Sequence, residues 1–399
     1  MQPGDRQDAR GERARQAAAL TFAINGLVFA SFVSRAPAIR DALGLTNGGL
    51  GLLLVSISVG SLVALPLSGS VVGRLGPART ITVTVLVVTA AFAVAALGLQ
   101  LGSVALAAPA LLLKGLSFAT WDVAMNVEGA HVERRLARPL MPRFHAAFSL
   151  GTVLGAAIGA ACSALGIGVA AQLVGVQLAV VGVVLVAVRS MVGMAADPAD
   201  AGRPSARGAW TEPRTLLIGL MVLCFALAEG IANDWLAIAM VDGYGSSEAF
   251  GAVTFGAFVA AMTLGRLFGG ALLERLGRPV VLRALAGTVI VGVLVVVFAP
   301  SAPWAVAGAA VWGLGASLGF PVGISAAADD ERMSTVRVSV VSSIGYTAFL
   351  GGPPLIGLLA DSRGILDALL LVPVAMAAAL LAVGASRPPA PSVTSGREC

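Results

Sequence analysis

The feature that most constrains this chain is a series of long apolar runs, separated by short polar segments. A helix needs about 20 apolar residues to cross a hydrocarbon core about 30 Å thick. Every backbone polar group must be hydrogen-bonded internally there, so such a run can cross only as a helix. The sequence therefore predicts an all-α integral membrane protein with twelve transmembrane helices. We place them at residues 16–35, 47–73, 79–99, 103–125, 145–166, 169–189, 215–240, 248–274, 279–299, 303–327, 337–360 and 365–386.

The composition agrees with a protein that faces lipid. Hydrophobic residues make up 57% of the chain and charged residues 12%, whereas soluble domains are about 25% charged. Cys162 and Cys224 lie in apolar runs and Cys399 ends the chain, which fits neither a metal site nor a disulfide framework. His131 and His145 are the only histidines. We therefore expect no metal site and no cofactor.

The basic residues predict the orientation. If the N-terminus is cytoplasmic, the outer segments hold only Arg35, Arg40 and Arg363, and Lys114 and Arg266 lie within spans. All other arginines then fall in cytoplasmic segments, as the positive-inside rule requires. The sequence thus predicts a multi-pass protein of the inner (plasma) membrane with both termini cytoplasmic. The net charge of +5 follows this topology, so we expect the lipid bilayer and not nucleic acid as a partner.

The longest polar break divides the chain into two halves with six runs each. We predict two pseudo-symmetric six-helix bundles with the boundaries 1–15 (N-terminal tail), 16–189 (first bundle), 190–213 (central loop), 214–386 (second bundle) and 387–399 (C-terminal tail). A short motif repeats between the halves, at 69–76 and 270–278. In both copies an apolar run ends with arginine, leucine and glycine, and a new run follows. Repeated halves are typical of secondary transporters.

These features resemble the major facilitator superfamily over about residues 16–386. The second-half motif is similar to that family's G-x-x-x-(D/E)-R-x-G-R loop, with Glu274 in the acidic position, whereas the first copy has Gly73 there. In the fourth run, Asp122-Val123-Ala124-Met125-Asn126 resembles the acid-x-A-x-N segment of the fucose permease branch of sugar–proton symporters. Phe320-Pro321 and the Gly351–Gly357 segment also resemble that branch. The resemblance implies that Asp122 is a protonation site, although those transporters have a second acid in the first span and residues 16–35 contain none.

Ionisable residues inside spans are the candidates for coupling, because each costs at least about 2.5–3.5 kcal/mol to insert. Lys114 and Asp122 lie about 12 Å apart along one helix and differ by about 80° around it, so both can face one cavity. Asn126 follows one turn after Asp122. A buried carboxyl group can bind and release a proton. The alternative is that Asp122 pairs with a loop arginine.

The seventh run supplies Glu229, Asn233 and Asp234. The family resemblance implies that spans 1, 4, 7 and 10 line a central cavity. We expect Glu229 to lie at the depth of Lys114, to serve in proton coupling, and either to form an ion pair with Lys114 or to hold a substrate charge in alternation with it. The alternative is a permanent buried pair that fixes the two halves. Asp234 lies about 140° around the helix from Glu229 and is expected at a gate or the boundary.

Other candidates for the substrate cavity are polar or aromatic. They are Asn25, Phe29 and Phe32 in the first span and Trp121 and Trp312 in the fourth and tenth, although all of them could equally be packing residues.

A cytoplasmic gate is expected from the charged loops. Glu274 should approach the start of the fifth span near Arg143 and His145, where the positive end of the helix dipole favours a carboxylate. Arg74, Arg275 and Arg278 complete the predicted gate. This contact can form only when the cytoplasmic side is shut, so it would stabilise an outward-facing state.

We therefore expect a monomer that moves a small-molecule substrate by alternating access and is not an enzyme, because no nucleophile–base pair or phosphate-binding loop is present. Proton-coupled symport of a sugar-like or other small polar solute comes first. Proton-antiport efflux of a drug or metabolite is a second interpretation. A transporter-like membrane sensor that does not transport is a third.

Overall fold

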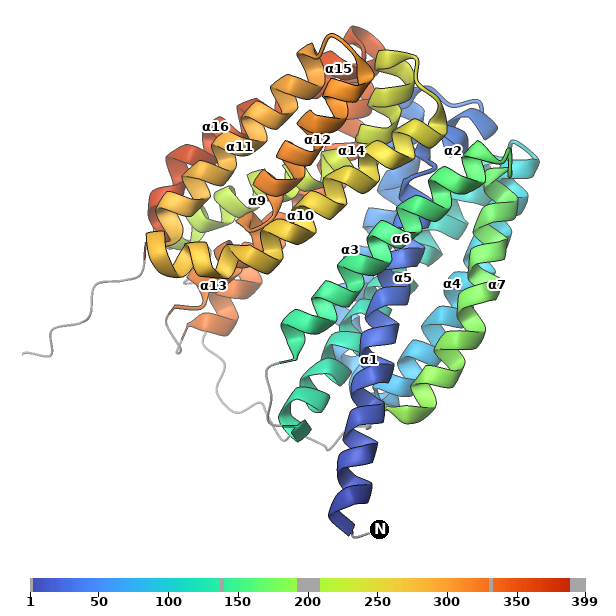
Figure 1. Cartoon of the computed structure of the whole chain (residues 1–399), viewed down its shortest axis with the longest axis vertical. Coiled ribbons are helices and arrows are strands. Elements are labelled where there is room, and N and C mark those ends of the chain that lie inside the picture. Colours follow the sequence, from blue (N-terminus) through green and yellow to red (C-terminus); the bar gives the residue numbers. More distant parts are fainter. Residues whose placement is uncertain (1–2, 137–139, 192–208, 330–332, 388–399) are drawn as a thin grey trace, which may run out of the picture.

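The computed structural model describes residues 3–136, 140–191, 209–329 and 333–387, and their regular elements are all helices (Figure 1). The first half contains α1 (Pro3–Val33), α2 (Ala36–Ala42), α3 (Asn47–Leu75), α4 (Pro77–Gln100), α5 (Val104–Leu136), α6 (Met141–Ala164), α7 (Val169–Ala187) and the short η1 (Val188–Ser190). The second half contains α9 (Pro213–Ile238), η2 (Ala239–Gly243), α10 (Glu248–Leu276), α11 (Arg278–Phe298), α12 (Ala302–Ala316), α13 (Gly319–Ala327), α14 (Ser334–Arg363), α15 (Ile365–Ala368), α16 (Leu371–Ala382) and η3 (Val383–Ser386).

The twelve predicted spans are confirmed. Among the described residues, 12 helical segments are long and apolar enough to cross a membrane, and each overlaps one predicted run. Several differ in detail, and the twelfth, for example, is divided into α15 and α16. The fourth continues to Leu136, well past the predicted end at 125. The tenth is broken between α12 and α13, because Pro321 has no backbone N–H to donate to the carbonyl of Ser317 four residues earlier; that carbonyl instead accepts a hydrogen bond of 3.2 Å from the Arg266 side chain.

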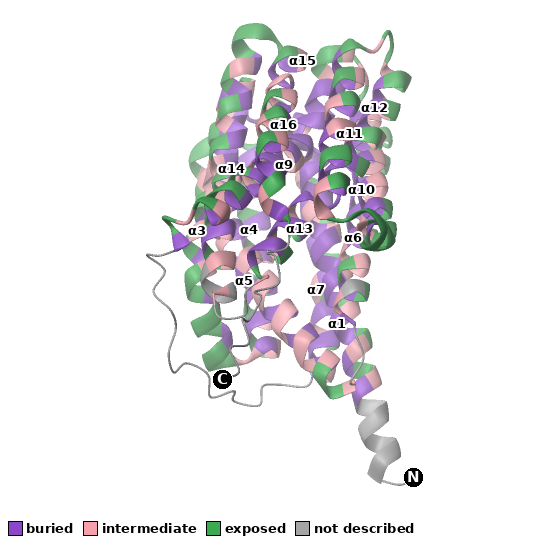
Figure 2. Ribbon diagram, turned by 90° about the vertical axis from the view of Figure 1, so that its left-hand side faces the viewer, coloured by how far each residue is buried: buried purple, intermediate pink, exposed green. Residues whose placement is uncertain are grey.

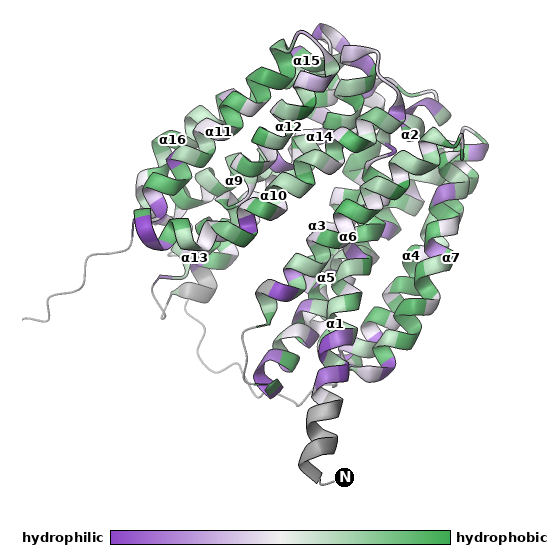
Figure 3. Ribbon diagram, in the orientation of Figure 1, coloured by the Kyte–Doolittle hydropathy of each residue, from purple (hydrophilic) through white to green (hydrophobic). Residues whose placement is uncertain are grey.

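The outer faces of the bundles are apolar. Large side chains such as Leu381, Phe268 and Phe298 are 88%, 72% and 69% exposed. Hydrophobic colouring runs along the outward faces of the helices, which are also the exposed faces (Figures 2 and 3). A soluble protein rarely exposes apolar surface on this scale, whereas lipid chains solvate it.

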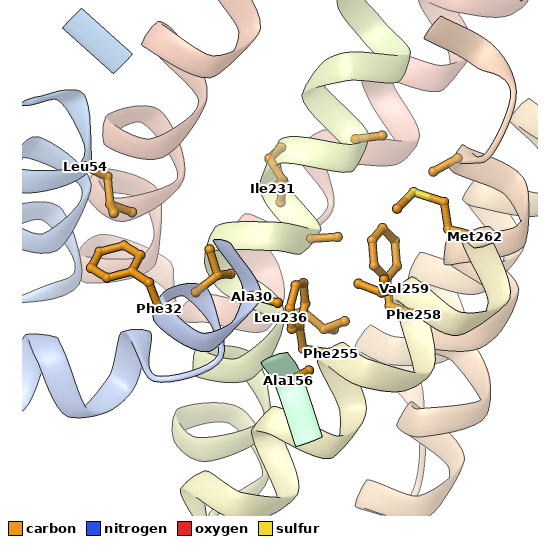
Figure 4. Packing of buried hydrophobic residues seen from close by; sticks show 14 of the residues in the cluster. Ala30, Phe32, Leu54, Ala156, Ile231, Leu236, Phe255, Phe258, Val259 and Met262 are labelled. Carbon is orange, nitrogen blue, oxygen red and sulfur yellow. The ribbon is translucent and has the colours of Figure 1, made fainter. Parts of the chain in front are cut away.

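The two halves meet along α3 and α14 and along α6 and α10. They are close at one end and diverge toward the end where α1 begins (Figure 1). We call the latter the terminal end and the former the opposite end. Figure 4 shows the apolar part of the α6–α10 contact, where Ala156 lies beside Phe255. The neighbouring Gly256 leaves only 3.6 Å between its ideal Cβ position and the Cβ of Ala156.

The repeated motif has the same backbone in both halves. Gly76 has φ 77° and ψ 158°, and Gly277 has φ 76° and ψ 158°. Each residue ends one helix and begins the next, with a positive φ that favours glycine. The internal repeat is therefore a structural repeat.

Helices α1 and α6 touch through their backbones. An added Cβ at Gly151 would lie 1.8 Å from the carbonyl oxygen of Ala23, and one at Gly26 would lie 2.1 Å from that of Phe148. Small residues permit such contacts between helices in membranes. This contact holds α1, which lines the cavity described below, in place.

We predict that Gly151→Ala lowers the free energy of unfolding by about 1–3 kcal/mol, because the methyl group must displace the backbone of α1. Gly175→Ala is the matched control, because nothing lies within 4 Å of its ideal Cβ in α7. Thermal unfolding of the purified protein in detergent measures both. Equal melting temperatures for the two variants would contradict the inferred contact.

Candidate functional site

A cavity of about 300 Å³ lies between the two halves. The first half contributes side chains from α1, α3, α5 and α6, and the second half contributes α9 and α14. The residues that the argument uses are Asn25, Phe29, Phe32, Lys114, Phe118, Asp122, Phe148, Asn233, Asp234, Tyr346 and Phe349. Of the residues predicted for the cavity or for coupling, the structure thus brings together Asn25, Phe29 and Phe32 of α1, Lys114 and Asp122 of α5, and Asn233 of α9.

Lys114 is buried on the cavity wall, with a relative exposure of 3%. Its Nζ lies 5.1 Å from the ring centroid of Phe32 and 4.9 Å from that of Phe118, which is cation–π distance. Asp234, on α9 of the other half, is the carboxylate whose charge acts on Lys114. Among the ion pairs of the described residues none joins these two side chains, so they form no direct salt bridge.

Asp122 lies on the same wall, toward the terminal end. Among the described residues its carboxylate has no hydrogen bond or ion pair, so the alternative of a pair with a loop arginine is not what the structure shows. The side chain of Asn126 donates a 2.8 Å hydrogen bond to the backbone carbonyl of Asp122. Asn126 therefore turns back onto α5 and does not line the cavity.

The predicted Lys114–Glu229 pair is wrong. Glu229 instead contacts Arg266 of α10 at 3.2 Å, within the second half. Glu229 and Asp234 are five positions apart in the helix, so their side chains point about 140° apart around its axis. Asp234, predicted at a gate or boundary, therefore faces the cavity, and Glu229 faces α10.

Only some of the aromatic and amide residues predicted for the cavity line it. Asn25, Phe29, Phe32 and Asn233 line the cavity. Trp121 and Trp312 are not among its lining residues and are buried between helices. Their rings lie 6.1 Å from that of Phe118 and 5.8 Å from that of Phe258, respectively.

Ion pairs join the halves at the opposite end. Arg40 binds Asp242 through both terminal nitrogens, one at 3.0 Å, and Arg35 lies 3.4 Å from Glu248. Burial alone would lower the pKa of the Arg40 guanidinium, but hydrogen bonds and charges from Asp242 and Asp41 raise it above its usual value. These contacts close the cavity on this side.

A second contact at this end comes from the backbone. The amide of Gly48, at the start of α3, donates a 2.9 Å hydrogen bond to Asp361 near the end of α14. Halfway along the same two helices, the hydroxyl of Ser58 donates to the carbonyl oxygen of Phe349 at 2.6 Å.

The predicted gate residues do not meet at the terminal end. Glu274, Arg275, Arg74 and Arg143 are exposed. Arg278 binds Asp329 at 2.7 Å, within its own half. The contact of Glu274 with the start of α6 needs the halves to close at this end, so it stays a prediction for another conformation.

Several site residues were missed by sequence reasoning. Phe118 could have been found, because it follows Lys114 by one helical turn. Tyr346 and Phe349 of α14 and the Arg40–Asp242 contact left no local signal, because they depend on how the halves meet across more than 200 positions.

Comparison with known proteins gives the family. The fold and its cavity define a multi-pass membrane transporter. The sequence matches the model of the Major Facilitator Superfamily at residues 18–330 and 218–398. It is 31% identical over 351 residues to an uncharacterized transporter of Sinorhizobium fredii, covering 86% of this chain and 89% of the relative. It is also 31% identical to an uncharacterized MFS-type transporter of Yersinia pestis, over 86% and 88% of the two chains. The chain therefore belongs to the Major Facilitator Superfamily.

Solved structures share the fold at low sequence identity. A mutant of the nucleoside transporter NupG superposes with a TM-score of 0.77 at 12% identity, covering 94% of this chain and 98% of that one. A bacterial homologue of the lysosomal transporter Spinster, described as inward-facing and occupied, gives 0.74 at 14% identity, covering 94% and 96%. At such identities these likenesses concern the fold.

We predict that Arg40→Gln opens the opposite end. Loss of the contact with Asp242 removes about 1 kcal/mol, which increases the population of a separated state roughly fivefold. The separated state can be detected as a longer distance between two spin labels, measured by double electron–electron resonance. The labels are placed at Leu165 and Trp304, which are 75% and 63% exposed at this end of the two halves.

The labels are introduced with the native cysteines replaced by serine. The matched control is Arg363→Gln, an exposed arginine at the same end that forms no ion pair within the described part of the chain. Identical distance distributions for Arg40→Gln and the control would remove Arg40 from the closure.

We also predict that Glu229 is coupled to Arg266 and not to Lys114. In a double-mutant cycle of Glu229→Gln with Arg266→Gln, the losses of unfolding free energy should be non-additive by about 0.5–3 kcal/mol, because the residues touch. Glu229→Gln with Lys114→Gln should be additive. Thermal unfolding in detergent tests both cycles, and the reverse pattern would restore the Lys114–Glu229 pair.

Proposed function

We propose that this protein couples uptake of a small polar solute to protons by alternating access, as a monomer. The observation that carries the proposal is the position of Asp122, a carboxyl group on the wall of a cavity between two repeated halves, with no hydrogen bond or ion pair to another described residue. An ionisable group at this depth is a functional candidate by default, and a carboxyl group can carry a proton.

The two sides of the membrane follow from charge. The positive-inside pattern supports an orientation in the inner membrane with the terminal end facing the cytoplasm. The contacts of Arg40 and Arg35 then close the outside, and this structure is an inward-facing state. In the outward-facing state Glu274 approaches the start of α6 near Arg143, with Arg74, Arg275 and Arg278 around it.

Symport is favoured over antiport by distance. Lys114 and Asp122 are eight residues apart on α5, about 12 Å along the helix. A solute at Lys114 and a proton at Asp122 can therefore be bound together. Antiport with a shared site needs them to compete, so proton-antiport efflux is the second candidate.

The resemblance of Asp122-Val123-Ala124-Met125-Asn126 to the fucose permease branch supports a sugar-like or similarly polar solute. It also supports protonation at Asp122. Asn126 acts in this proposal through the backbone of Asp122, to which it is hydrogen-bonded, and not as a contact to solute.

We predict that Asp122→Asn abolishes proton-driven uptake in proteoliposomes and leaves counterflow exchange within about twofold of the wild type, because exchange needs no net proton movement. The solute is one identified by a thermal-shift screen of sugars, organic acids, amino acids and cationic drugs.

Asp367→Asn, at an exposed acid of α15 outside the cavity, is the control and should not change either rate. Unchanged driven uptake in Asp122→Asn would remove the residue from coupling. Competition between solute and protons for binding would instead establish antiport.

A further inference from the structure

The cavity contains two opposite charges that come from different halves of the protein. Lys114 projects from α5, and Asp234 projects from α9 on the other side. Each is about nine or ten residues from the opposite end of its helix, so the two lie at similar depth. The charges interact, yet no salt bridge between them is among those of the described residues. Buried charges without direct partners are costly, so a bound group that pairs with both would stabilise this arrangement.

Asn25 adds an amide to the same wall. Its relative exposure is 0%, and neither Nδ2 nor Oδ1 has a hydrogen-bond partner among the residues that the structure describes. Buried amides are nearly always hydrogen-bonded, and each unmade bond costs free energy. Asn25 therefore has one acceptor and one two-proton donor for a ligand. Asn233, next to Asp234, is a second amide on the wall.

The rest of the wall is aromatic. Phe29, Phe118, Phe148 and Phe349 line the cavity beside the charged pair. Phe29 lies 6.4 Å from Phe118, ring centroid to ring centroid. Ligand pockets of about 300 Å³ fall at the small end of the usual range and suit a molecule of about a dozen non-hydrogen atoms. Such walls bind an apolar group.

We propose that the cavity binds a small zwitterion with an apolar side group, such as an amino acid. Its carboxylate binds Lys114, its ammonium group binds Asp234, and its apolar group lies against the phenylalanine rings. Asn25 hydrogen-bonds the charged end. This proposal names the solute class of the transport function proposed above and rests on it.

Other solute classes satisfy fewer of these groups. An anion would leave Asp234 unpaired and add negative charge to a cavity that already holds Asp122 and Asp234. A cation would leave Lys114 unpaired. A neutral sugar would bind the amides but neither charge. A zwitterion pairs both charges without changing the net charge of the cavity.

The positions of Lys114 and Asp234 also explain how a bound solute would act on both halves. Because Lys114 and Asp234 belong to different bundles, a zwitterion between them is attracted to both. The bound solute would then favour a state in which the bundles are closer at the cavity. A solute that contacts one bundle has no such effect, because a ligand shifts a conformational equilibrium only by its differential affinity for the two states.

The test is direct binding to the purified protein in detergent, by scintillation proximity or calorimetry. The probes share one carbon skeleton: phenylalanine (zwitterion), phenethylamine (cation) and 3-phenylpropanoate (anion). Leucine, isopentylamine and 4-methylpentanoate form an aliphatic set, and fucose is the neutral probe. We expect at least one zwitterion to bind at least about tenfold more tightly than its amine and acid, because each charged contact is lost in one of them.

Two variants should change which of the three kinds of probe binds most tightly. Asp234→Asn should weaken zwitterion binding at least about tenfold and leave binding of the acid unchanged or tighter. Lys114→Gln should also weaken zwitterion binding at least about tenfold, but leave binding of the amine unchanged or tighter. Asp234→Glu keeps the charge and should restore zwitterion preference, which separates lost charge from misfolding. Asp367→Asn, outside the cavity, is the control and should bind like the wild type.

Tight binding of fucose with none of the zwitterions, equal binding of a zwitterion and its acid, or no binding of any zwitterion would each overturn the proposal. Binding needs neither a proton gradient nor Asp122. Zwitterion binding without proton-driven uptake would therefore overturn the proposed function alone, whereas driven uptake of a sugar without zwitterion binding would overturn this inference alone.

Discussion

The structure depends on the cost of leaving a polar group unpaired in hydrocarbon. That cost makes every span a helix, and it turns ionisable side chains away from the lipid. Arg266 avoids this cost by binding Glu229 and the carbonyl of Ser317, which Pro321 leaves without a helical hydrogen bond. Lys114, Asp122 and Asp234 avoid this cost in another way, because they face a cavity between the halves and not the lipid. The cavity is thus where charge can be present in the membrane without a permanent partner.

Whether two charges belong to the same half decides what they can do. Glu229 and Arg266 lie on neighbouring helices of one bundle, so their contact persists when the bundles move as rigid bodies. Lys114 and Asp234 lie on different bundles, so their separation changes with that motion. A pair of the first kind stabilises a bundle. Under the proposed mechanism, charges of the second kind would link what is bound in the cavity to the conformation of the whole protein.

The sequence was sufficient for the spans because an apolar run of sufficient length has one solution in lipid. It was also sufficient to select Lys114 and Asp122, since any ionisable residue in a span is conspicuous. It could not decide between Glu229 and Asp234, because that choice depends on the rotation of α9 about its axis, which packing of neighbours such as Trp235 fixes. Trp121 and Trp312 were ambiguous for the same reason: a large aromatic ring suits a helix interface as well as a cavity.

The two ends of the molecule differ in how they are held. At the opposite end, Arg40 and Asp242 join the halves while remaining 12% and 26% exposed. Partly exposed pairs of this kind are worth about 0–1 kcal/mol each, so a few of them favour one conformation without locking it. At the terminal end the two copies of the repeat differ by one acid, since Gly73 stands where Glu274 stands in the second half. A transporter must move between states of similar free energy, and weak contacts such as those at the opposite end keep the difference small enough for a bound solute to overcome.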